Sequence, residues 1–117
     1  MKDFKKLLIW QKGFKIALDT YRITKEFPMD EKYGLSSQMN RASISISSNI
    51  AEGSSRRSEK DYFRFIEFAL GSCYELESQL LIASELSFSD NVKLNQLLNE
   101  IDEEQKMLIS FMKQLKN

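Results

Sequence analysis

Hydrophobic residues recur with helical spacing in four long segments of the chain. In the first segment, about residues 4–25, positions three and four apart form one stripe: Leu7, Trp10, Phe14, Ala17, Tyr21 and Thr24. Phe27 and Pro28 end this segment, because a residue that precedes proline avoids the helical region. The spacing therefore predicts a helix over residues 4–25 with this stripe in the core.

The same segment carries a second apolar stripe, in which Ile9, Ile16 and Ile23 repeat every seven residues. At about 100° per residue it lies roughly 130° from the first stripe, so one core cannot bury both. A helix that is apolar on two sides usually packs on two partners. We therefore predict a contact between subunits formed by these isoleucines and surplus aromatic residues farther along the chain: Ile9, Ile16, Ile23, Phe63, Phe65 and Phe68. The alternative is that the helix is deeply buried within its own bundle.

A second helix is expected to begin near Asp30 as its N-cap and to end at Gly53 as its C-terminal cap. Its core positions again alternate by four and three: Leu35, Met39, Ala42, Ile46 and Asn49. Residues 43–48 alternate serine with isoleucine, which is also typical of a strand. We predict a helix there because the pattern on both sides is helical.

The third segment has the most regular pattern of the four. Ser58 is a candidate N-cap with Asp61 three residues later. The core positions are unbroken: Tyr62, Ile66, Ala69, Cys73, Leu76, Leu80 and Ala83. Gly71 weakens a helix locally, so we expect a close helix contact beside it.

A fourth helix is expected after Ser89 or Asp90, and Glu104 interrupts its apolar stripe: Leu94, Leu97, Ile101, Glu104, Leu108, Phe111 and Leu115. Short turns make sequential helices antiparallel. The fold class is therefore all-α, an antiparallel up-down-up-down four-helix bundle in a single domain, residues 1–117.

Composition argues against an enzyme. The chain has no His, and its one cysteine, Cys73, lies on a core stripe. No glycine-rich phosphate loop occurs, and carboxylate bundles that bind paired metals use a Glu-x-x-His pattern that is missing. We predict no catalytic residue, metal, cofactor or small-molecule substrate. No apolar run approaches a membrane span and the run from Leu7 to Trp10 is too short for a signal peptide, so a cytoplasmic location is expected.

Charge is distributed unevenly although the net charge is zero. Residues 1–60 hold 12 Lys and Arg against 7 Asp and Glu, a net +5, whereas residues 61–117 hold 5 against 10, a net −5. The functional interpretation is phosphate contact by basic residues on the first helix and around the second turn. The candidates are Lys12, Lys15, Arg22, Arg41, Arg56, Arg57, Lys60 and Arg64. The alternative is ordinary surface solubility.

Several motifs resemble one bacterial family. They are Leu8-Ile-Trp-Gln, the stretch Arg41-Ala-Ser-Ile-Ser-Ile-Ser-Ser-Asn-Ile-Ala-Glu-Gly, and Ala69-Leu-Gly-Ser-Cys-Tyr-Glu-Leu-Glu. Together they resemble the ribosomal RNA intervening-sequence proteins over nearly the whole chain. The resemblance implies a four-helix bundle assembled into a ring, since relatives of the family resemble pentameric barrels.

The resemblance also implies RNA or a nucleoprotein as a partner and offers no catalytic residues. Five polar residues match its motifs and are expected to form a hydrogen-bonded network that fixes helix register or subunit contacts: Arg41, Asn49, Glu52, Ser72 and Glu75. A protein–protein adaptor with no nucleic-acid role is the alternative function.

Overall fold

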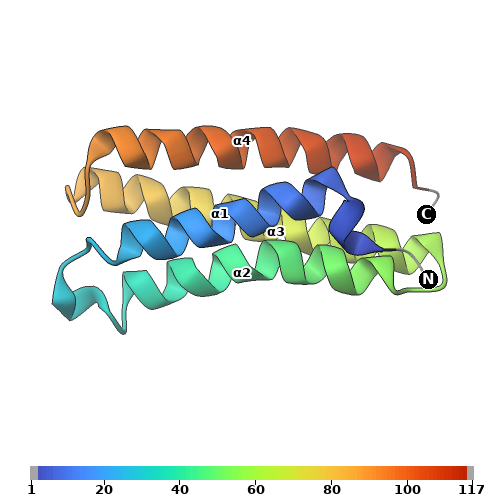
Figure 1. Cartoon of the computed structure of the whole chain (residues 1–117), viewed down its shortest axis with the longest axis horizontal. Coiled ribbons are helices and arrows are strands. Elements are labelled where there is room, and N and C mark those ends of the chain that lie inside the picture. Colours follow the sequence, from blue (N-terminus) through green and yellow to red (C-terminus); the bar gives the residue numbers. More distant parts are fainter. Residues whose placement is uncertain (1–2, 116–117) are drawn as a thin grey trace.

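The computed structural model describes residues 3–115, and every regular element among them is a helix. Four long helices lie side by side lengthwise: α1 (Leu8–Thr24), α2 (Leu35–Ser54), α3 (Glu59–Glu85) and α4 (Asn91–Lys113) (Figure 1). Two short 3-10 helices, η1 (Phe4–Lys6) and η2 (Met29–Glu31), precede α1 and α2. The molecule measures 43 × 23 × 21 Å.

Each long helix packs against two others. Helix α1 contacts α2 and α4, and α3 contacts the same two helices from the other side. The α1–α2 and α3–α4 connections lie at one end of the molecule, and the α2–α3 turn lies at the opposite end (Figure 1). The side of the bundle between α1 and α2 therefore faces away from the side between α3 and α4.

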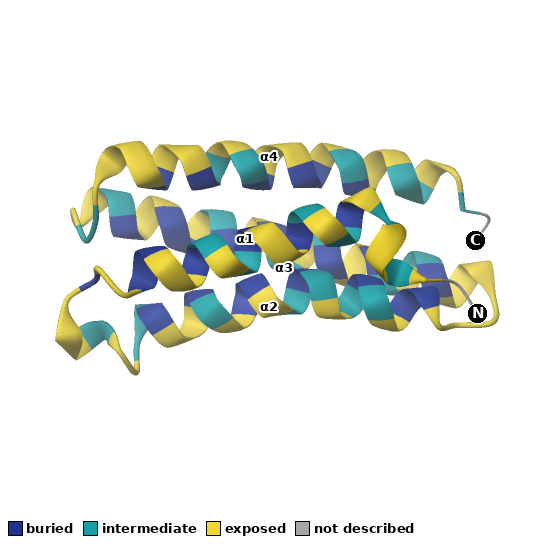
Figure 2. Cartoon of the chain, in the orientation of Figure 1, coloured by how far each residue is buried: buried dark blue, intermediate teal, exposed yellow. Residues whose placement is uncertain are grey.

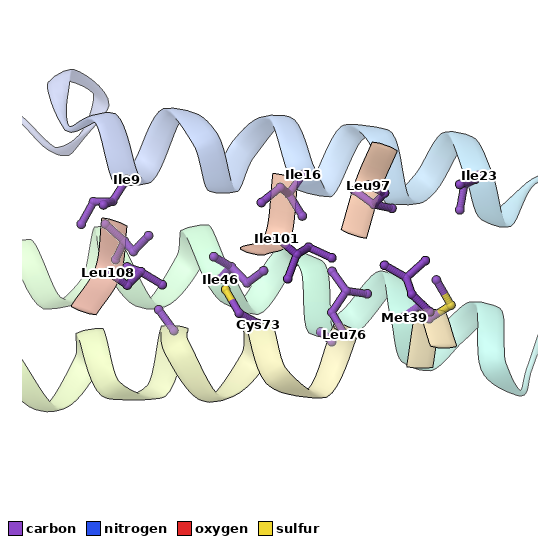
Figure 3. Packing of buried hydrophobic residues seen from close by; sticks show 14 of the residues in the cluster. Ile9, Ile16, Ile23, Met39, Ile46, Cys73, Leu76, Leu97, Ile101 and Leu108 are labelled. Carbon is purple, nitrogen blue, oxygen red and sulfur yellow. The ribbon is translucent and has the colours of Figure 1, made fainter. Parts of the chain in front are cut away.

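The core is a continuous column of apolar side chains from all four helices (Figures 2 and 3). All seven core positions predicted for α3 are buried, as are most of those predicted for α2 and α4. Phe111 and Leu115, near the end of the chain, are only half-buried. In α2, the predicted core residues Leu35 and Asn49 are half-buried as well. The spacing of apolar residues thus placed most of the interior of these three helices correctly.

Helix α1 is rotated relative to the prediction. Ile9, Ile16 and Ile23 are 4%, 0% and 4% exposed and point from α1 into the bundle (Figure 3), whereas Phe14 and Tyr21 are 47% and 41% exposed. The prediction that the isoleucines lie on the surface is wrong, and buried side chains cannot form the expected subunit contact. The physical reason is that small buried residues flank them, including Gly13 and Thr20. Such a face lets α1 approach its neighbours closely, which bulky rings would prevent.

The start of α2 also differs from the prediction. The helix begins at Leu35 rather than near Asp30, because Asp30 belongs to η2. The N-cap residue, Gly34, has no side chain, and the Glu31 carboxylate instead accepts a hydrogen bond from the backbone N–H of Leu35 at 3.3 Å. Residues 43–48 are helical, as predicted. There, the Ser43 hydroxyl donates to the Asn40 carbonyl at 2.8 Å, so a residue with weak helix propensity satisfies its own polar group.

Two glycines have roles other than those predicted. Gly53 lies inside the last turn of α2 instead of capping it, and a Cβ there would come within 2.7 Å of the Phe65 Cβ. Its lack of a side chain therefore lets α2 and α3 meet closely beside the turn. Gly71 has open space around it, so the close contact predicted there is wrong. The predicted caps at Ser58 and Asp90 are confirmed, because each side chain accepts a backbone N–H of the first turn.

Candidate partner-binding surfaces

Half of the predicted basic candidates are engaged in ion pairs within the chain. Lys12 binds Glu103 of α4 at 2.7 Å. Lys15 binds Asp19 at 2.9 Å and also Glu100 of α4. Arg22 and Arg56 pair within their own helices, with Asp19 at 3.1 Å and with Glu52 at 2.7 Å. The basic sector predicted on α1 is therefore used mainly to hold α1 beside α4 and is not free for a phosphate.

The other four candidates are exposed and have no carboxylate partner among residues 3–115. Arg57, Lys60 and Arg64 follow one another across the α2–α3 turn. Arg41 stands 16 positions before Arg57 along the chain, in the first half of α2, so it lies roughly 20 Å or more from the turn. The structure thus separates the candidates into a cluster at the turn and a single arginine on the side of the bundle.

The five polar residues matched to the family motifs do not form a network with one another. The Asn49 amide donates to the Ser45 carbonyl at 2.8 Å, and the Ser72 hydroxyl donates to the Phe68 carbonyl at 3.1 Å. Glu52 binds Arg56 of the same helix. Arg41 and Glu75 are exposed. No shared network therefore forms within the chain, because these side chains satisfy themselves locally or face solvent, and a role in subunit contacts stays a prediction.

One apolar surface lies along the α1–α2 side of the bundle. Phe14, Leu18 and Tyr21 are exposed on one stripe of α1, and Tyr21 and Ile44 of α2 line the same shallow pocket. The Trp10 and Phe14 rings stack at 5.0 Å between centroids. We call Phe14, Leu18 and Ile44 the α1–α2 face. The sequence pattern assigned Phe14 and Tyr21 of this stripe to the core and did not single out Leu18.

A second apolar surface lies on the opposite side. Tyr74 and Leu81 stand three residues before and four after Glu77, whose carboxylate accepts a hydrogen bond from Gln105 of α4 at 2.8 Å. Residues at these spacings share one side of a helix, so both exposed side chains lie along the seam with α4. Ile109, four residues after Gln105, is exposed beside them. We call Tyr74, Leu81 and Ile109 the α3–α4 face.

The phenylalanines predicted to join the isoleucines lie on α3, apart from the α1 stripe. Phe63 and Phe65 are half-buried, and Phe68 is half-exposed and packs edge-on against Phe65 at 5.7 Å. The Arg56 guanidinium lies 4.6 Å from the Phe65 ring centroid, which covers that ring further. Only Phe68 of the six predicted interface residues presents a large exposed area.

A buried carboxyl group occupies the centre of the bundle. Glu104 is fully buried, and no described residue donates a hydrogen bond to either carboxyl oxygen. Burial raises its pKa to about 8, which the charge of Lys12 opposes. Gly13 makes room for it, because a Cβ at Gly13 would come within 3.1 Å of the Glu104 carboxylate. The sequence marked this residue as a break in the apolar stripe but gave no sign of its missing partners.

Comparison with known proteins identifies the family. A model of the family described as 23S rRNA-intervening sequence protein matches residues 5–110. The chain belongs to this family. A crystal structure of an S23 ribosomal protein family member of unknown function from Bacteroides thetaiotaomicron VPI-5482 has the same fold, with a TM-score of 0.83 and 24% identity. The similarity covers 91% of this chain and 99% of that one. No curated protein matches the chain.

The one cysteine of this 23S rRNA-intervening sequence family protein is shielded from solvent. Cys73 is buried, and burial together with Glu104 and Glu77 raises the pKa of its thiol, so the reactive thiolate is disfavoured. Within residues 3–115, no three acidic or cysteine side chains are grouped as a metal site would require. Over the same range, no helix combines the length and hydropathy needed to cross a membrane.

Proposed function

We propose that this chain is a non-enzymatic scaffold that binds RNA. In this proposal its antiparallel up-down-up-down bundle assembles into a ring-shaped homo-oligomer, with five subunits as the family resemblance implies. The observation that carries the proposal is the distribution of unpaired cations. Of the described Lys and Arg residues without an ion pair, all but two precede residue 61: Lys5, Lys6, Lys25, Lys32, Arg41, Arg57 and Lys60, with Arg64 and Lys113 beyond.

Unpaired cations favour a phosphate-bearing partner for a physical reason. A cation that is already paired must give up its carboxylate to bind a phosphate, whereas an unpaired one only releases counterions and water. Arg57, Lys60 and Arg64 lie within eight consecutive positions at the α2–α3 turn. Contacts of this kind position an RNA backbone without reading its sequence. The turn is therefore the first candidate contact with RNA.

Assembly is supported by the two opposite apolar faces. The α1–α2 face belongs to the half of the sequence with net charge +5, and the α3–α4 face to the half with −5. When the first face of one subunit meets the second face of the next, opposite charges meet around an apolar centre. Such a head-to-tail contact closes into a ring if the rotation between subunits permits. The revised contact replaces the buried isoleucines with Phe14 and Leu18.

Sedimentation velocity tests the assembly. Wild-type protein is expected to sediment as a multiple of 13.7 kDa. Phe14→Asp/Leu18→Asp is expected to be monomeric and folded, because both side chains are exposed in the isolated bundle. A matched control, Met29→Asp, places a charge on an exposed residue outside both faces and should remain assembled. A monomeric wild type, or an assembled double variant, would contradict the proposed contact.

Charge reversal tests RNA binding, in variants that keep the helix content of the wild type. Arg57→Glu/Lys60→Glu should weaken binding of a labelled RNA at low salt and lower the dependence of affinity on salt. The control Lys106→Glu/Lys113→Glu changes the net charge equally but lies in the acidic half on α4. Equal losses in both variants, or no RNA binding by the wild type at low salt, would count against the proposal.

The exposed apolar faces also favour a second candidate function, a protein–protein adaptor. In that case a protein rather than RNA would occupy the assembled ring. Binding through apolar surface changes little with salt and shows a negative heat-capacity change, so calorimetry at two temperatures separates it from phosphate contact.

A further inference from the structure

A shallow pocket lies beside the connection between α1 and α2, at the end of the bundle away from the α2–α3 turn. Its volume is about 480 Å³, and its chemically distinctive lining residues are Tyr21, Lys32, Tyr33, Ser37, Asn40 and Arg41. A second pocket of about 320 Å³ continues from it, sharing Tyr21, Lys32 and Asn40 and adding Lys25. Neither pocket is lined by an Asp or Glu.

Two exposed tyrosine rings line this pocket. Tyr33 is 89% exposed, and the Lys32 ammonium lies 5.6 Å from its ring centroid. Tyr21 is exposed on the facing helix. An aromatic ring held beside a cation and open to solvent is a platform on which a nucleobase can stack. In the isolated chain no core packing accounts for the position of Tyr33.

The cations around these rings are free to bind an anion. Lys25, Lys32 and Arg41 form no ion pair with any carboxylate in the described part of the chain. The nearby acids of the connection are partly engaged, since Glu26 binds Lys93 and Ser89, and Glu31 accepts a hydrogen bond from the first residue of α2. Asp30 is exposed on η2 and is not among the lining residues.

Polar groups at the floor could read the edge of a base. The Thr24 hydroxyl lies 3.0 Å from the Asn40 side-chain oxygen and 3.2 Å from the Tyr21 carbonyl oxygen, and it donates its one proton to either. No residue within 3–115 accepts a hydrogen bond from the Asn40 amide nitrogen. The Ser37 hydroxyl is on the exposed side of α2. The pocket thus combines rings for stacking, cations for phosphates and an amide for hydrogen bonding.

We propose that this pocket binds an unpaired base of single-stranded RNA, stacked on Tyr33 and Tyr21, with Lys32 and Arg41 on the flanking phosphates. The inference rests on the proposed RNA function and adds a substrate class and a site to it. Single-stranded RNA is favoured over a duplex because duplex bases are already stacked on each other and cannot reach the rings. RNA is favoured over an apolar peptide because the pocket is cationic and free of carboxylates.

The position of the pocket is compatible with the proposed ring. Phe14 and Leu18 lie nearer the start of α1, whereas Tyr21 and the connection lie at its end. Only Ile44 belongs both to the pocket wall and to the α1–α2 face. A subunit contact centred on Phe14 and Leu18 would border the pocket at Ile44 and leave its Tyr33 and Lys32 side open, where a strand could pass from subunit to subunit.

Fluorescence anisotropy with a labelled single-stranded RNA dodecamer and its duplex provides the test. Tyr33→Ala is expected to weaken single-strand binding about tenfold, since each stacked base contributes roughly that factor or more. Tyr33→Phe keeps the ring on which a base stacks, so its affinity should be within about twofold of the wild type. Phe68→Ala, which removes a half-exposed ring from α3, is the matched control and should bind like wild type.

A second measurement concerns the cations. Lys32→Gln/Arg41→Gln should reduce the slope of log affinity against log salt by about 1.4, the value for two phosphate contacts with a single strand. Tyr33→Ala should leave that slope unchanged.

The outcomes separate the two proposals. If the wild type binds RNA but Tyr33→Ala binds equally well, or if duplex binds as tightly as single strand, this inference is wrong and the proposed function stands. If the wild type binds no RNA at low salt, both are wrong. Because Tyr33 is almost fully exposed, loss of folding cannot mimic the expected result, and circular dichroism of each variant checks this.

Discussion

Helix α1 is held by two seams of different chemistry. On the α4 side, charged groups close the seam: Lys12 binds Glu103, Lys15 binds Glu100, and Glu26 binds Lys93. On the α2 side no ion pair joins the helices within residues 3–115. The contact there is made by small and hydroxyl residues, such as Thr24 beside Asn40. Exposed rings and unpaired cations lie along this second seam.

The chemistry of the two seams indicates on which side of α1 a partner can bind. Charges on the α4 side are neutralised within the chain, so a partner there would first have to break existing pairs. On the α2 side, apolar side chains are exposed and cations have no carboxylate partner within the chain. A partner that covers this side would bury the apolar side chains and pair with the cations. A basic residue in the sequence therefore indicates a binding surface only if the fold leaves it unpaired.

The largest effect on the free energy of unfolding is expected at Glu104, beside the α4 seam. Its pKa of about 8 when folded lies above the ordinary 4.5, so the unfolded chain loses this proton at a lower pH than the folded chain. The folded state is therefore penalised progressively as pH rises from about 4.5 to 8, and the penalty levels off above that. The shift corresponds to roughly 4 kcal/mol of unfolding free energy at pH 8.

Urea unfolding of wild type and Glu104→Gln at pH 5 and pH 8 measures this. The variant should match the wild type within about 1 kcal/mol at pH 5 and exceed it by roughly 3 kcal/mol or more at pH 8. Glu103→Gln is a control on the adjacent exposed residue and should show no such pH-dependent gain. An equal pH dependence in wild type and Glu104→Gln would show that the buried acid is not the cause.

Gly13 lies where the two seams meet. A Cβ there would come within 3.1 Å of both the Glu104 carboxylate and the Ile46 Cγ2 atom of α2. Gly13→Ala should therefore destabilise the protein by about 1 kcal/mol, because overpacking outweighs the gain in helix propensity. Gly71→Ala, with open space around it, should stabilise by about 0.5–1 kcal/mol. Thermal denaturation shows whether each variant is more or less stable than the wild type. A higher melting temperature for Gly13→Ala would mean that the two seams are packed less tightly than described.

The ion pairs of the α4 seam should have the smallest effect. Lys15 is more than half exposed, so Lys15→Met should cost about 0.5 kcal/mol at low salt and less as salt is added. Lys106→Met removes a pair with Asp102 inside α4 and should cost less still. Chemical denaturation at two salt concentrations compares them. A loss at Lys15 that is large and independent of salt would indicate packing by its alkyl chain rather than charge.

The sequence predicted the fold well where one stripe dominates a helix. Helix α3 has one regular core stripe, and all seven of its residues are buried. Helix α1 has two stripes, and counting large apolar residues placed Phe14 and Tyr21 in the core and the isoleucines outside it, whereas the structure has the reverse. Leu7 and Trp10 of the predicted stripe do pack against the core. The deciding signal was the small residues beside the isoleucines, Gly13 and Thr20, which allow close packing. The period and hydrophobicity of a stripe alone do not tell how closely the helix can approach its neighbours.

The candidate surfaces were less predictable. Lys12 and Lys15 look like free basic residues in the sequence, yet their partners Glu103 and Glu100 stand far away along the chain. Only the fold brings these pairs together. The pocket at Tyr21 and Tyr33 also depends on the fold, because the connection between α1 and α2 decides which side chains remain exposed. Local patterns cannot provide either fact.

Cross-linking tests most directly the claim that the α2 side of α1 faces another subunit. In a Cys73→Ala background, Leu18→Cys marks the α1–α2 face and Leu81→Cys marks the α3–α4 face. The two variants are refolded together or separately and treated with a short bis-maleimide. Covalent dimers are expected only in the mixture, because unlike faces meet. Dimers in the Leu18→Cys sample alone, or none in the mixture, would contradict it.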